Sequence, residues 1–452
     1  MRIDLIVPSF EDEKKRRMKG RAFRLPQISL GILAALTPPD IEVYYFDENM
    51  HDINFDSGAD LVGITSMTVT APRAYQIARE FKKRGAKVVM GGIHPSVLPY
   101  EALQYADSVV IGEAEYIWPI LVDDFRRKEL KPIYQANKNT EAADIPLPRR
   151  AIFKHKGYII TSLLQVTRGC PFDCDFCSAH LFMGKNYRKR PIAKVLEEIE
   201  KIKRPLIGFL DDNIIGNKSY AKQLFSALIP LKKSWLGQAD LSIADDPELL
   251  KLAAASGCKG VFIGFESVSQ DSLQELNKGF QKVKDMKDKI KRIHDAGIMI
   301  EGSFIFGMDT DDKSIFEKTL AFALDNNLAL ASFGILTPYP GTRLERRLRE
   351  EGRIISTNWR LYDCGHTVFR PKNMTVEELQ EGLDWAWWNF YSTKSIFKRI
   401  WHARKNILLT GVPLLILNFS YKRMLYRTTD VQSWLKEEAA APGIEILPRE
   451  TP

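Results

Sequence analysis

Three of the chain's five cysteines lie within eight residues, in the segment Cys170-Pro-Phe-Asp-Cys174-Asp-Phe-Cys177. A disulfide framework would spread its cysteines along the chain, whereas three thiols on one short loop are typical of a metal centre in a reducing compartment. Such a loop can bind three irons of a cubane cluster and leave the fourth iron open for substrate. The alternative is a zinc site with His180 as a fourth ligand. The spacing and the aromatic Phe176 before the last cysteine favour the cluster.

Residues 1–135 alternate apolar strand candidates with helix candidates. The expected strands are Arg2–Val7, Ile41–Phe46, Leu61–Thr65, Lys87–Met90 and Ser108–Ile111, and the expected helices are Ile28–Leu36, Ala71–Arg84, Pro99–Tyr105 and Tyr116–Arg127. Strands separated by helices predict a parallel, doubly wound, Rossmann-like sheet, whose ligands lie outside the carboxyl ends of the strands. Glycine-rich turns follow two of these strands. We therefore expect this domain to hold a cofactor.

A polar linker over residues 136–157 leads to a second α/β series over residues 158–350. Its strand candidates are Ile159–Val166, Leu206–Leu210, Leu236–Ile243, Gly260–Phe265, Met299–Phe306 and Ser332–Leu336. This series predicts a partial TIM-type (β/α)6 barrel with its active site at the carboxyl ends of the strands. Residues 351–452 are expected to form a helical region that covers the substrate.

The cysteine loop resembles that of the radical S-adenosylmethionine superfamily. The segments Phe209–Asn213, Gly264–Ser267 and Pro338–Thr342, at predicted strand ends, are similar to further motifs of this family. The resemblance implies a [4Fe–4S] cluster on the three cysteines and cleavage of S-adenosylmethionine to a 5′-deoxyadenosyl radical. The residues implied to contact S-adenosylmethionine are Phe176, Asp211, Asp212, Asn213, Gly264, Glu266 and Ser267. Carboxylates suit this ligand because they accept hydrogen bonds from its ammonium group and ribose hydroxyls.

Residues 60–114 resemble the cobalamin-binding domain that precedes the barrel in one large subclass of this superfamily. The residues implied to contact cobalamin are Ser66, Thr68, Gly91, Gly92, His94, Gly112 and Glu113. Cobalamin proteins with a cobalt-ligating histidine carry D-x-H-x-x-G, but the corresponding stretch reads Asp47-Glu-Asn-Met-His51-Asp-Ile. We therefore expect no protein imidazole on the lower face of cobalt. His94 is expected either to contact the corrin or to cap the next helix.

Three further features follow the barrel or lie in its turns. Cys364 and His366 either line the substrate cavity or have a structural role, and Cys258 is expected to be buried. From Trp385 to Thr429 the chain has no Asp or Glu but eight Lys and Arg residues, together with an apolar run at 407–417 that is too short to cross a bilayer. Residues 385–429 are expected either to contact an anionic membrane surface or to pack on the barrel as a lid with solvated charges.

The two resemblances cover about residues 1–370 and imply a cobalamin-dependent radical S-adenosylmethionine methyltransferase that acts on an unactivated carbon of a small molecule or a lipid. The implied electron donor is a reduced ferredoxin or flavodoxin. An enzyme of the same architecture that forms a ring, joins two carbons or oxidises its substrate needs the same cofactors, so the motifs leave it open. A non-catalytic metal- or corrin-binding module is the remaining alternative. No secretory signal and no nucleic-acid-binding module are recognised, so we expect a cytoplasmic protein without a nucleic-acid partner.

Overall fold

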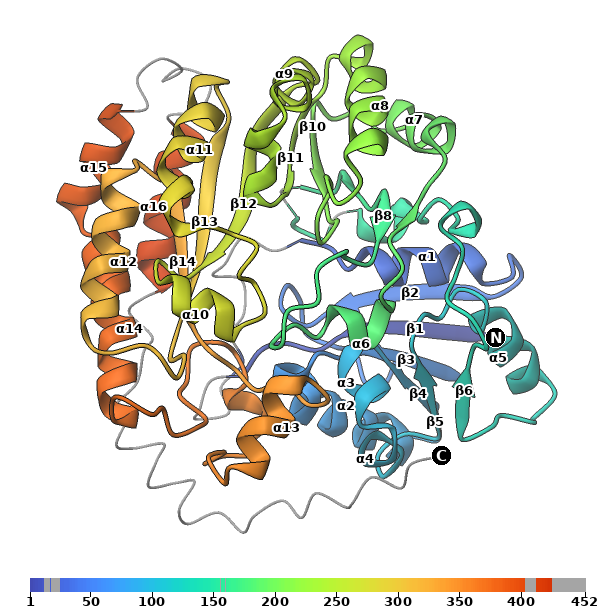
Figure 1. Ribbon diagram of the computed structural model, residues 1–452. Helices are drawn as coiled ribbons and strands as arrows, with labels where there is room; N and C mark the ends of the chain where they lie inside the picture. Colours follow the sequence, from blue (N-terminus) through green and yellow to red (C-terminus); the bar gives the residue numbers. More distant parts are fainter. Residues whose placement is uncertain (12–16, 18–24, 155, 159, 403–411, 425–452) are drawn as a thin grey trace.

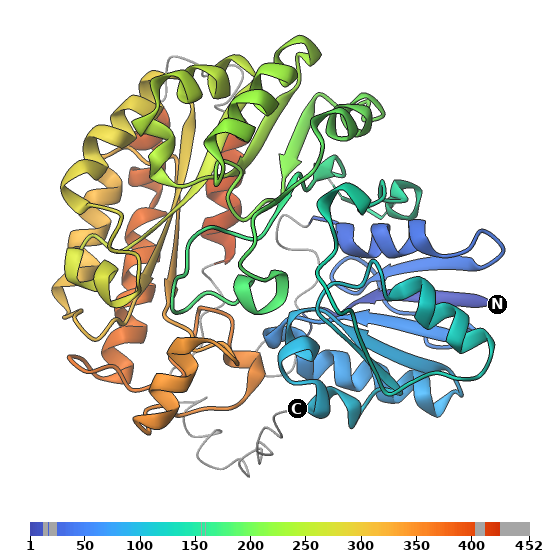
Figure 2. The same ribbon diagram turned by 45° about the vertical axis from the view of Figure 1, so that its right-hand side comes forward.

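The computed structural model describes residues 1–11, 17, 25–154, 156–158, 160–402 and 412–424. Two parallel sheets of six strands each organise the chain, one in the N-terminal part and one in the middle part. They lie side by side, with the C-terminal helices against the outer edge of the second sheet (Figures 1 and 2). The expected α/β class, with a doubly wound domain ahead of a partial barrel, is confirmed.

The N-terminal sheet has the strand order β2-β1-β3-β4-β5-β6. Its strands are β1 (Arg2–Val7), β2 (Glu42–Asp47), β3 (Leu61–Thr65), β4 (Lys87–Gly91), β5 (Ser108–Ile111) and β6 (Ile133–Gln135), and its helices are α1 (Ile28–Leu36), α2 (Ala71–Lys83), α3 (Ile93–Val97), α4 (Pro99–Leu103) and α5 (Trp118–Arg126). Consecutive residues such as Leu5 and Ile6 join hydrophobic cores on opposite faces of the sheet. Helices therefore cover both faces, as parallel sheets require. The short edge strand β6 carries too few apolar residues to be recognised in the sequence.

The second sheet has the order β14-β13-β12-β11-β10-β7 and forms an open barrel. Its strands are β7 (Leu163–Leu164), β10 (Leu206–Phe209), β11 (Ser234–Gln238), β12 (Cys258–Glu266), β13 (Met299–Phe306) and β14 (Leu330–Ile335), and β8 (Thr167–Arg168) pairs antiparallel with β9 (Arg188–Lys189). The helices are α6 (Ala179–Met183), α7 (Ile192–Glu200), α8 (Lys218–Leu228), α9 (Pro247–Ala255), α10 (Gln270–Glu275), α11 (Val283–Asp295), α12 (Ser314–Asp325) and α13 (Arg343–Glu350).

The expected strand Leu236–Ile243 is wrong in its second half. Strand β11 ends at Gln238, and a 3-10 helix occupies Leu241–Asp245. The cause is the side chain of Asp240, which accepts a hydrogen bond from the amide of Ser242 at 2.7 Å and so begins a helical turn. This side-chain cap ends the strand although the apolar residues continue.

Three C-terminal helices follow the 3-10 turn η6 (Trp359–Leu361): α14 (Val376–Phe390), α15 (Thr393–His402) and α16 (Val412–Met424). They cover the edge strand β14, where the Tyr391 hydroxyl donates to the carbonyl oxygen of Ala331 at 2.8 Å and Arg399 donates to that of Ala329 at 2.7 Å. The beginning of the apolar run, residues 407–411, lies outside the described residues. Within the described residues, no helix is long and apolar enough to cross a membrane.

Candidate active site

The cysteine loop follows β8 at the carboxyl end of the barrel sheet, and its three thiols are free and half-buried. Distant parts of the chain hold it in place. Arg343 of α13 donates to the carboxylate of Asp175 at 2.9 Å and to that of Asp173 at 3.0 Å. Asn277 donates to the carbonyl oxygen of Asp173 at 2.7 Å. The loop is thus fixed before any cofactor binds, which preorganises its thiols.

The chemistry of the thiols fits a metal cluster. Burial raises the pKa of Cys170 to about 11 and that of Cys174 to about 12, and it also raises the pKa of Cys177. The bare thiols are therefore protonated at neutral pH, and a cationic cluster would stabilise their thiolate forms and release the protons. The Nε2 atom of His180 contacts the carbonyl oxygen of Phe172, while its Nδ1 atom is buried without a hydrogen-bond partner among the described residues. Among the described residues, no three His, Cys, Asp or Glu side chains are grouped as ligands of one metal ion.

Charged side chains from successive strand ends surround the thiols. The carboxylates of Asp212 and Asp240 raise the pKa of Cys170, and that of Glu266 raises the pKa of Cys174. The ammonium group of Lys278 acts on Cys174 in the opposite direction. Carboxylates and an ammonium therefore stand together beside the loop. This combination is complementary to a ligand that carries both an ammonium and a carboxylate.

Glu266 and Lys278 form a buried ion pair within this group. The Lys278 Nζ atom lies 2.6 Å from Oε1 of Glu266 and donates to the carbonyl oxygen of Gly264 at 2.8 Å. Glu266 has a φ of +60°, which is rare for a residue with a side chain. A Cβ atom at Gly264 would lie 2.3 Å from the Glu266 carboxylate, so the close approach of these groups requires glycine. The pair fixes the carboxylate at the end of β12.

Three of the residues expected to contact S-adenosylmethionine are engaged elsewhere. Asp211 accepts from the amide of Val166 at 3.0 Å and from the hydroxyl of Thr167 at 2.6 Å, where the chain enters the cysteine loop. The side-chain amide of Asn213 donates to the carboxylate of Asp240 at 2.8 Å. The hydroxyl oxygen of Ser267 accepts from the amide of Ser269 at 3.1 Å. These side chains hold backbone and neighbouring groups in place. Phe176 packs against the barrel core.

The pH dependence of stability should report on Asp211. Burial raises its pKa to about 7, above the ordinary value of 3.8. The folded protein therefore binds an extra proton between these two values, and the free energy of unfolding should fall as pH rises from about 4 to 7. In Asp211→Asn this contribution to the slope should disappear while Oδ1 still accepts its hydrogen bonds. Urea unfolding between about pH 4 and 7 measures this dependence, with the exposed substitution Asp288→Asn as control. Equal slopes of unfolding free energy against pH in Asp211→Asn and wild type would contradict the prediction.

Open space lies at the carboxyl edge of the N-terminal sheet. Gly112 follows β5 with a φ of +76°, and a Cβ atom there would meet nothing within 4 Å. Gly91, at the end of β4, has only ordinary contacts around its Cβ position. Position 92 requires glycine for a different reason: a Cβ atom there would lie 2.6 Å from the carbonyl oxygen of Ser66. Ser66 and Thr68 follow β3 at the same edge, but both are buried, and the Ser66 hydroxyl donates to the carbonyl oxygen of Met67 at 3.0 Å.

His94 is buried and belongs to a polar network that joins the N-terminal domain to the C-terminal region. Its Nε2 atom lies 3.0 Å from the hydroxyl of Tyr75 and 3.3 Å from the carboxylate of Glu101. Trp359 of η6 donates to the same carboxylate at 2.9 Å, and its ring packs edge-on against the imidazole. Of the two alternatives expected for His94, the helix cap is wrong, because neither α3 nor α4 has a side-chain cap.

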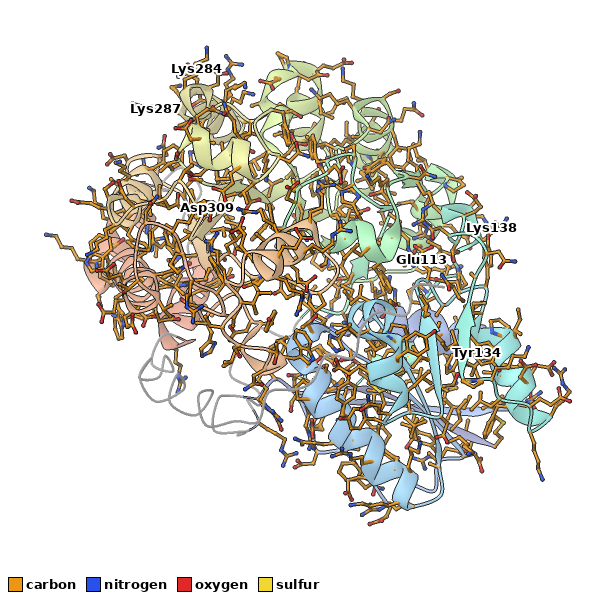
Figure 3. All side chains as sticks on the ribbon, turned by 60° about the horizontal axis from the view of Figure 1, so that its bottom comes forward. Glu113, Tyr134, Lys138, Lys284, Lys287 and Asp309 are labelled. Atoms are coloured by element: carbon orange, nitrogen blue, oxygen red, sulfur yellow. The ribbon has the colours of Figure 1, made fainter. Side chains whose placement is uncertain are left out.

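Glu113 and Glu115 of the N-terminal domain form ion pairs with Arg168 and Arg188 of the barrel, and we call this group of four residues the clasp. The carboxylate of Glu113 accepts from Arg188 of β9 at 2.7 and 2.8 Å and lies 3.2 Å from Arg168 of β8. Arg168 also pairs with Glu115, and both of these groups are buried. Glu113, labelled in Figure 3, thus lies between the two domains. Its charge is satisfied by arginines of the barrel.

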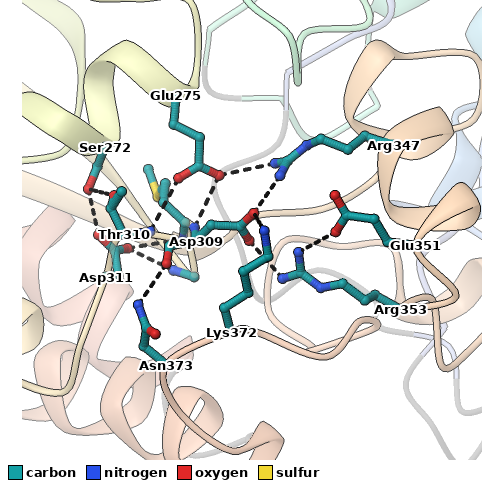
Figure 4. A network of polar contacts seen from close by, with 12 residues as sticks. Ser272, Glu275, Asp309, Thr310, Asp311, Arg347, Glu351, Arg353, Lys372 and Asn373 are labelled. Atoms are coloured by element: carbon teal, nitrogen blue, oxygen red, sulfur yellow. Dashed lines mark hydrogen bonds and ion pairs between the residues drawn. The ribbon is translucent and has the colours of Figure 1, made fainter.

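A second polar network fixes the segment that covers the barrel mouth (Figure 4). Asp309, in the loop after β13, lies 2.8 Å from both Arg353 and Lys372 and also pairs with Arg347. Burial opposes ionisation, but these cations lower the pKa of Asp309 to about 2. The carboxylate is therefore charged throughout the physiological range. It ties α13 and residues 353–373 to one strand end.

That covering segment carries Cys364 and His366. Cys364 has a φ of +62°, and its Sγ atom lies 3.2 Å from the hydroxyl of Tyr339 in the turn after β14. The charge of Glu266 contributes to the raised pKa of Cys364, after burial as the main cause. His366 Nδ1 lies 3.0 Å from the carboxylate of Asp363. Cys364 is thus on the same side of the barrel as the cysteine loop, whereas Cys258 is buried as expected.

Asp240, Lys278 and Arg168 are the charged residues at the site that sequence reasoning missed. Asp240 had a detectable signal, because it is polar and follows the apolar strand that ends at Gln238. Lys278 had none, since it lies twelve positions after Glu266 in a separate loop. Arg168 lies next to the cysteine loop and would be taken for an ordinary surface residue. The hydrogen-bond and ion-pair partners of these three residues become their neighbours only in the folded protein.

An open parallel barrel with a three-cysteine loop, set against a doubly wound domain with an open carboxyl edge, defines a class of enzymes that use two cofactors. The radical SAM superfamily matches residues 164–323, the B12 binding domain 24–122 and a domain of unknown function (DUF4070) 342–413. The chain belongs to the family of cobalamin-dependent radical SAM methyltransferases. The expected [4Fe–4S] cluster, S-adenosylmethionine and cobalamin are the cofactors of this family, so these predictions are confirmed.

Two relatives from Chlorobaculum tepidum are similar over most of their length. Bacteriochlorophyllide d C-8(2)-methyltransferase is 34% identical, over 85% of this chain and 90% of the relative. Bacteriochlorophyllide d C-12(1)-methyltransferase is 32% identical, over 82% and 84%. The solved structure of the cobalamin-dependent S-adenosylmethionine radical enzyme OxsB, with aqua-cobalamin and S-adenosylmethionine bound, has a TM-score of 0.68 at 16% identity and covers 96% of this chain and 74% of its own. This structural likeness shows a shared fold.

Proposed function

We propose that Cys170, Cys174 and Cys177 bind the [4Fe–4S] cluster and that S-adenosylmethionine lies between them and the Glu266–Lys278 ion pair. The observation that carries this proposal is the convergence of carboxylates and one ammonium on three free thiols at the barrel's carboxyl end. When bound, the cluster and cobalamin supply one-electron cleavage of S-adenosylmethionine and a carrier for the methyl group. The protein's own groups bind and orient these partners and exclude water.

Each remaining residue has a role that its contacts support. Asp212 and Glu266 are placed to accept from the ammonium or ribose of S-adenosylmethionine, and Phe176 and Gly264 shape its binding space. Asp211, Asn213 and Ser267 are positioning residues. Ser66, Thr68, Gly91, Gly92 and Gly112 form the cobalamin edge, whereas His94 and Glu113 fix the domains around it. These roles support the domain limits 1–135, 158–350 and 351–452, with 136–157 as linker.

The substrate class follows from the relatives and from the cover of the barrel. The two relatives act on bacteriochlorophyllide d, a large ring system. In this chain aromatic side chains are concentrated in the C-terminal helices, where the ring of Trp387 stacks on Tyr391 and Tyr421. We infer a large, ring-containing and mostly apolar substrate that takes a methyl group on an unactivated carbon. Ring formation without methyl transfer is the rival reaction on the same site.

The test begins with anaerobic protein that carries a reconstituted cluster and added hydroxocobalamin. Dithionite and S-adenosylmethionine are then supplied with a candidate ring substrate, and the nucleoside products and the product mass are measured. Methyl transfer predicts both 5′-deoxyadenosine and S-adenosylhomocysteine, with a product heavier by one CH₂. Ring formation predicts a product that has lost hydrogens and no S-adenosylhomocysteine tied to turnover. Absence of 5′-deoxyadenosine would overturn the radical assignment of these residues.

We also propose that the C-terminal helices contact an anionic membrane surface. Their exposed large apolar side chains are Trp385, Trp388, Phe397, Ile416 and Phe419, of which Phe397 and Ile416 are 57% and 61% exposed. Lysines of the same helices, including Lys394 and Lys422, supply positive charge. Apolar and cationic groups together favour the interface of an anionic bilayer.

Vesicle sedimentation checks this membrane contact. Phe397→Ser with Ile416→Ser should reduce binding to phosphatidylglycerol vesicles about tenfold, because two apolar side chains no longer enter the interface. Tyr100→Ser is a matched control, since Tyr100 is 54% exposed on α4 of the N-terminal domain. Equal binding by the double variant and the wild-type protein would contradict the proposal, as would equal binding to neutral and anionic vesicles.

A further inference from the structure

The outer side of the cysteine loop carries exposed aromatic surface. Phe172, between the first two cysteines, stacks on Phe280 with ring centroids 4.2 Å apart and an interplanar angle of 11°. Phe280 nevertheless remains 47% exposed, and Pro171 beside it is exposed as well. Exposed aromatics are common at protein interfaces because they bury much area with little loss of side-chain freedom. This surface covers the loop itself, so a protein bound there would lie directly over the thiols.

Cationic side chains flank these aromatic rings. Lys282 and Lys284 lie within four residues of Phe280, and both are exposed. Lys185 lies 3.2 Å from Asp173, and Arg343 pairs with Asp173 and Asp175, so the loop's own carboxylates are already neutralised. Figure 3 shows Lys284 and Lys287 pointing outward from α11. The basic rim, which we define as Lys282 and Lys284, is complementary to an acidic partner.

The reaction itself requires an electron donor. Reductive cleavage of S-adenosylmethionine consumes one electron, and none of the described side chains beside the loop supplies it. We propose that Phe172, Phe280 and the basic rim form the docking surface for a small acidic electron-transfer protein. The carrier gives up one electron and is oxidised, while S-adenosylmethionine is reduced and its C5′–S bond breaks to give methionine and a 5′-deoxyadenosyl radical. This inference rests on the proposed function, because it assumes the cluster on Cys170, Cys174 and Cys177.

The test uses two variants of the reconstituted holoenzyme, Lys282→Glu with Lys284→Glu, and Phe280→Ser. Lys284 lies in the first turn of α11, where glutamate is well tolerated, so the charge reversal should not disturb the fold. With reduced flavodoxin as donor, each variant should need about tenfold more donor for half-maximal formation of 5′-deoxyadenosine. With dithionite, which needs no docking surface, both should match the wild-type rate. Lys203→Glu is the matched control, since Lys203 is exposed and precedes β10 at the amino end of the barrel sheet, opposite the cysteine loop.

Direct binding separates this inference from the proposed function. Binding of oxidised flavodoxin, measured by calorimetry at low and moderate salt, should weaken in both variants and remain unchanged in Lys203→Glu. Unchanged donor requirement and unchanged binding in both variants would overturn the docking surface. An equal loss with dithionite would also overturn it, because the residues would then act on the cluster site. A wild-type protein that binds flavodoxin through this surface but forms no 5′-deoxyadenosine would instead refute the proposed function alone.

Discussion

Cys174→Ala is expected to lose S-adenosylmethionine cleavage by at least about a thousandfold, because a cubane cluster held by three thiolates loses one of its ligands. The two carboxylates of the loop do not replace it, because Asp173 and Asp175 are paired with Arg343. Iron content and the yield of 5′-deoxyadenosine after anaerobic reconstitution are the two measurements. Both should fall together, because the cluster is the route of the electron.

Cys258→Ala is the matched control for this loss. Cys258 is also a free cysteine, but it is buried at the start of β12, where its Sγ atom lies 3.8 Å from the carbonyl oxygen of Gly260. Its replacement should cost about 1 kcal/mol of stability and leave iron and cleavage intact. Full iron occupancy and cleavage in Cys174→Ala would contradict the assignment. Loss of iron in Cys258→Ala would show that the assay reports folding and not ligation.

The sequence predicted the fold well wherever hydrophobic periodicity was strong. Strands β1 and β13 and helix α1 have the expected bounds, because each is a continuous apolar or amphipathic run between clear breaks. The strand expected at Leu236–Ile243 was overextended because the Asp240 cap is a side-chain effect inside an apolar stretch. Such local hydrogen bonds compete with strand pairing and leave no periodic signal.

The candidate site was predictable in its motifs but not in its electrostatics. The three cysteines lie within eight residues, and each strand-end carboxylate directly follows a predicted strand, so the sequence shows both features. The ion pair of Glu266 with Lys278 and the clasp of Glu113 with Arg188 join residues that the chain brings together only after folding. For the same reason the polar partners of His94, which come from α2, α4 and η6, could not be read from the sequence. Long-range pairing of charges is set by tertiary structure, which single-sequence patterns do not encode.

The clasp between the domains carries the second large prediction. Arg168→Met should lower the free energy of unfolding by about 3–5 kcal/mol, because it leaves the buried carboxylate of Glu115 without its cation. The double variant Arg168→Met/Glu115→Gln should be less destabilised than Arg168→Met alone, since it contains no unpaired buried charge. Thermal and urea unfolding measure both. Equal stability of the two variants would show that the Arg168–Glu115 pair is not coupled.

The pH dependence of this loss has a definite sign. Burial alone would raise the pKa of Glu115, but the charge of Arg168 outweighs it and lowers the pKa below its ordinary 4.5. The pair's contribution is therefore present above that value and is lost as pH falls through the lower pKa of the folded state. In Arg168→Met the unpaired carboxylate takes up a proton more readily. The stability difference from wild type should thus be largest at neutral pH and shrink toward about pH 4.

Because the clasp joins the cobalamin edge to the cysteine loop, Arg168→Met should also retain less cobalamin after gel filtration at neutral pH. Arg127→Met, on the outer surface of the N-terminal domain, should retain it fully.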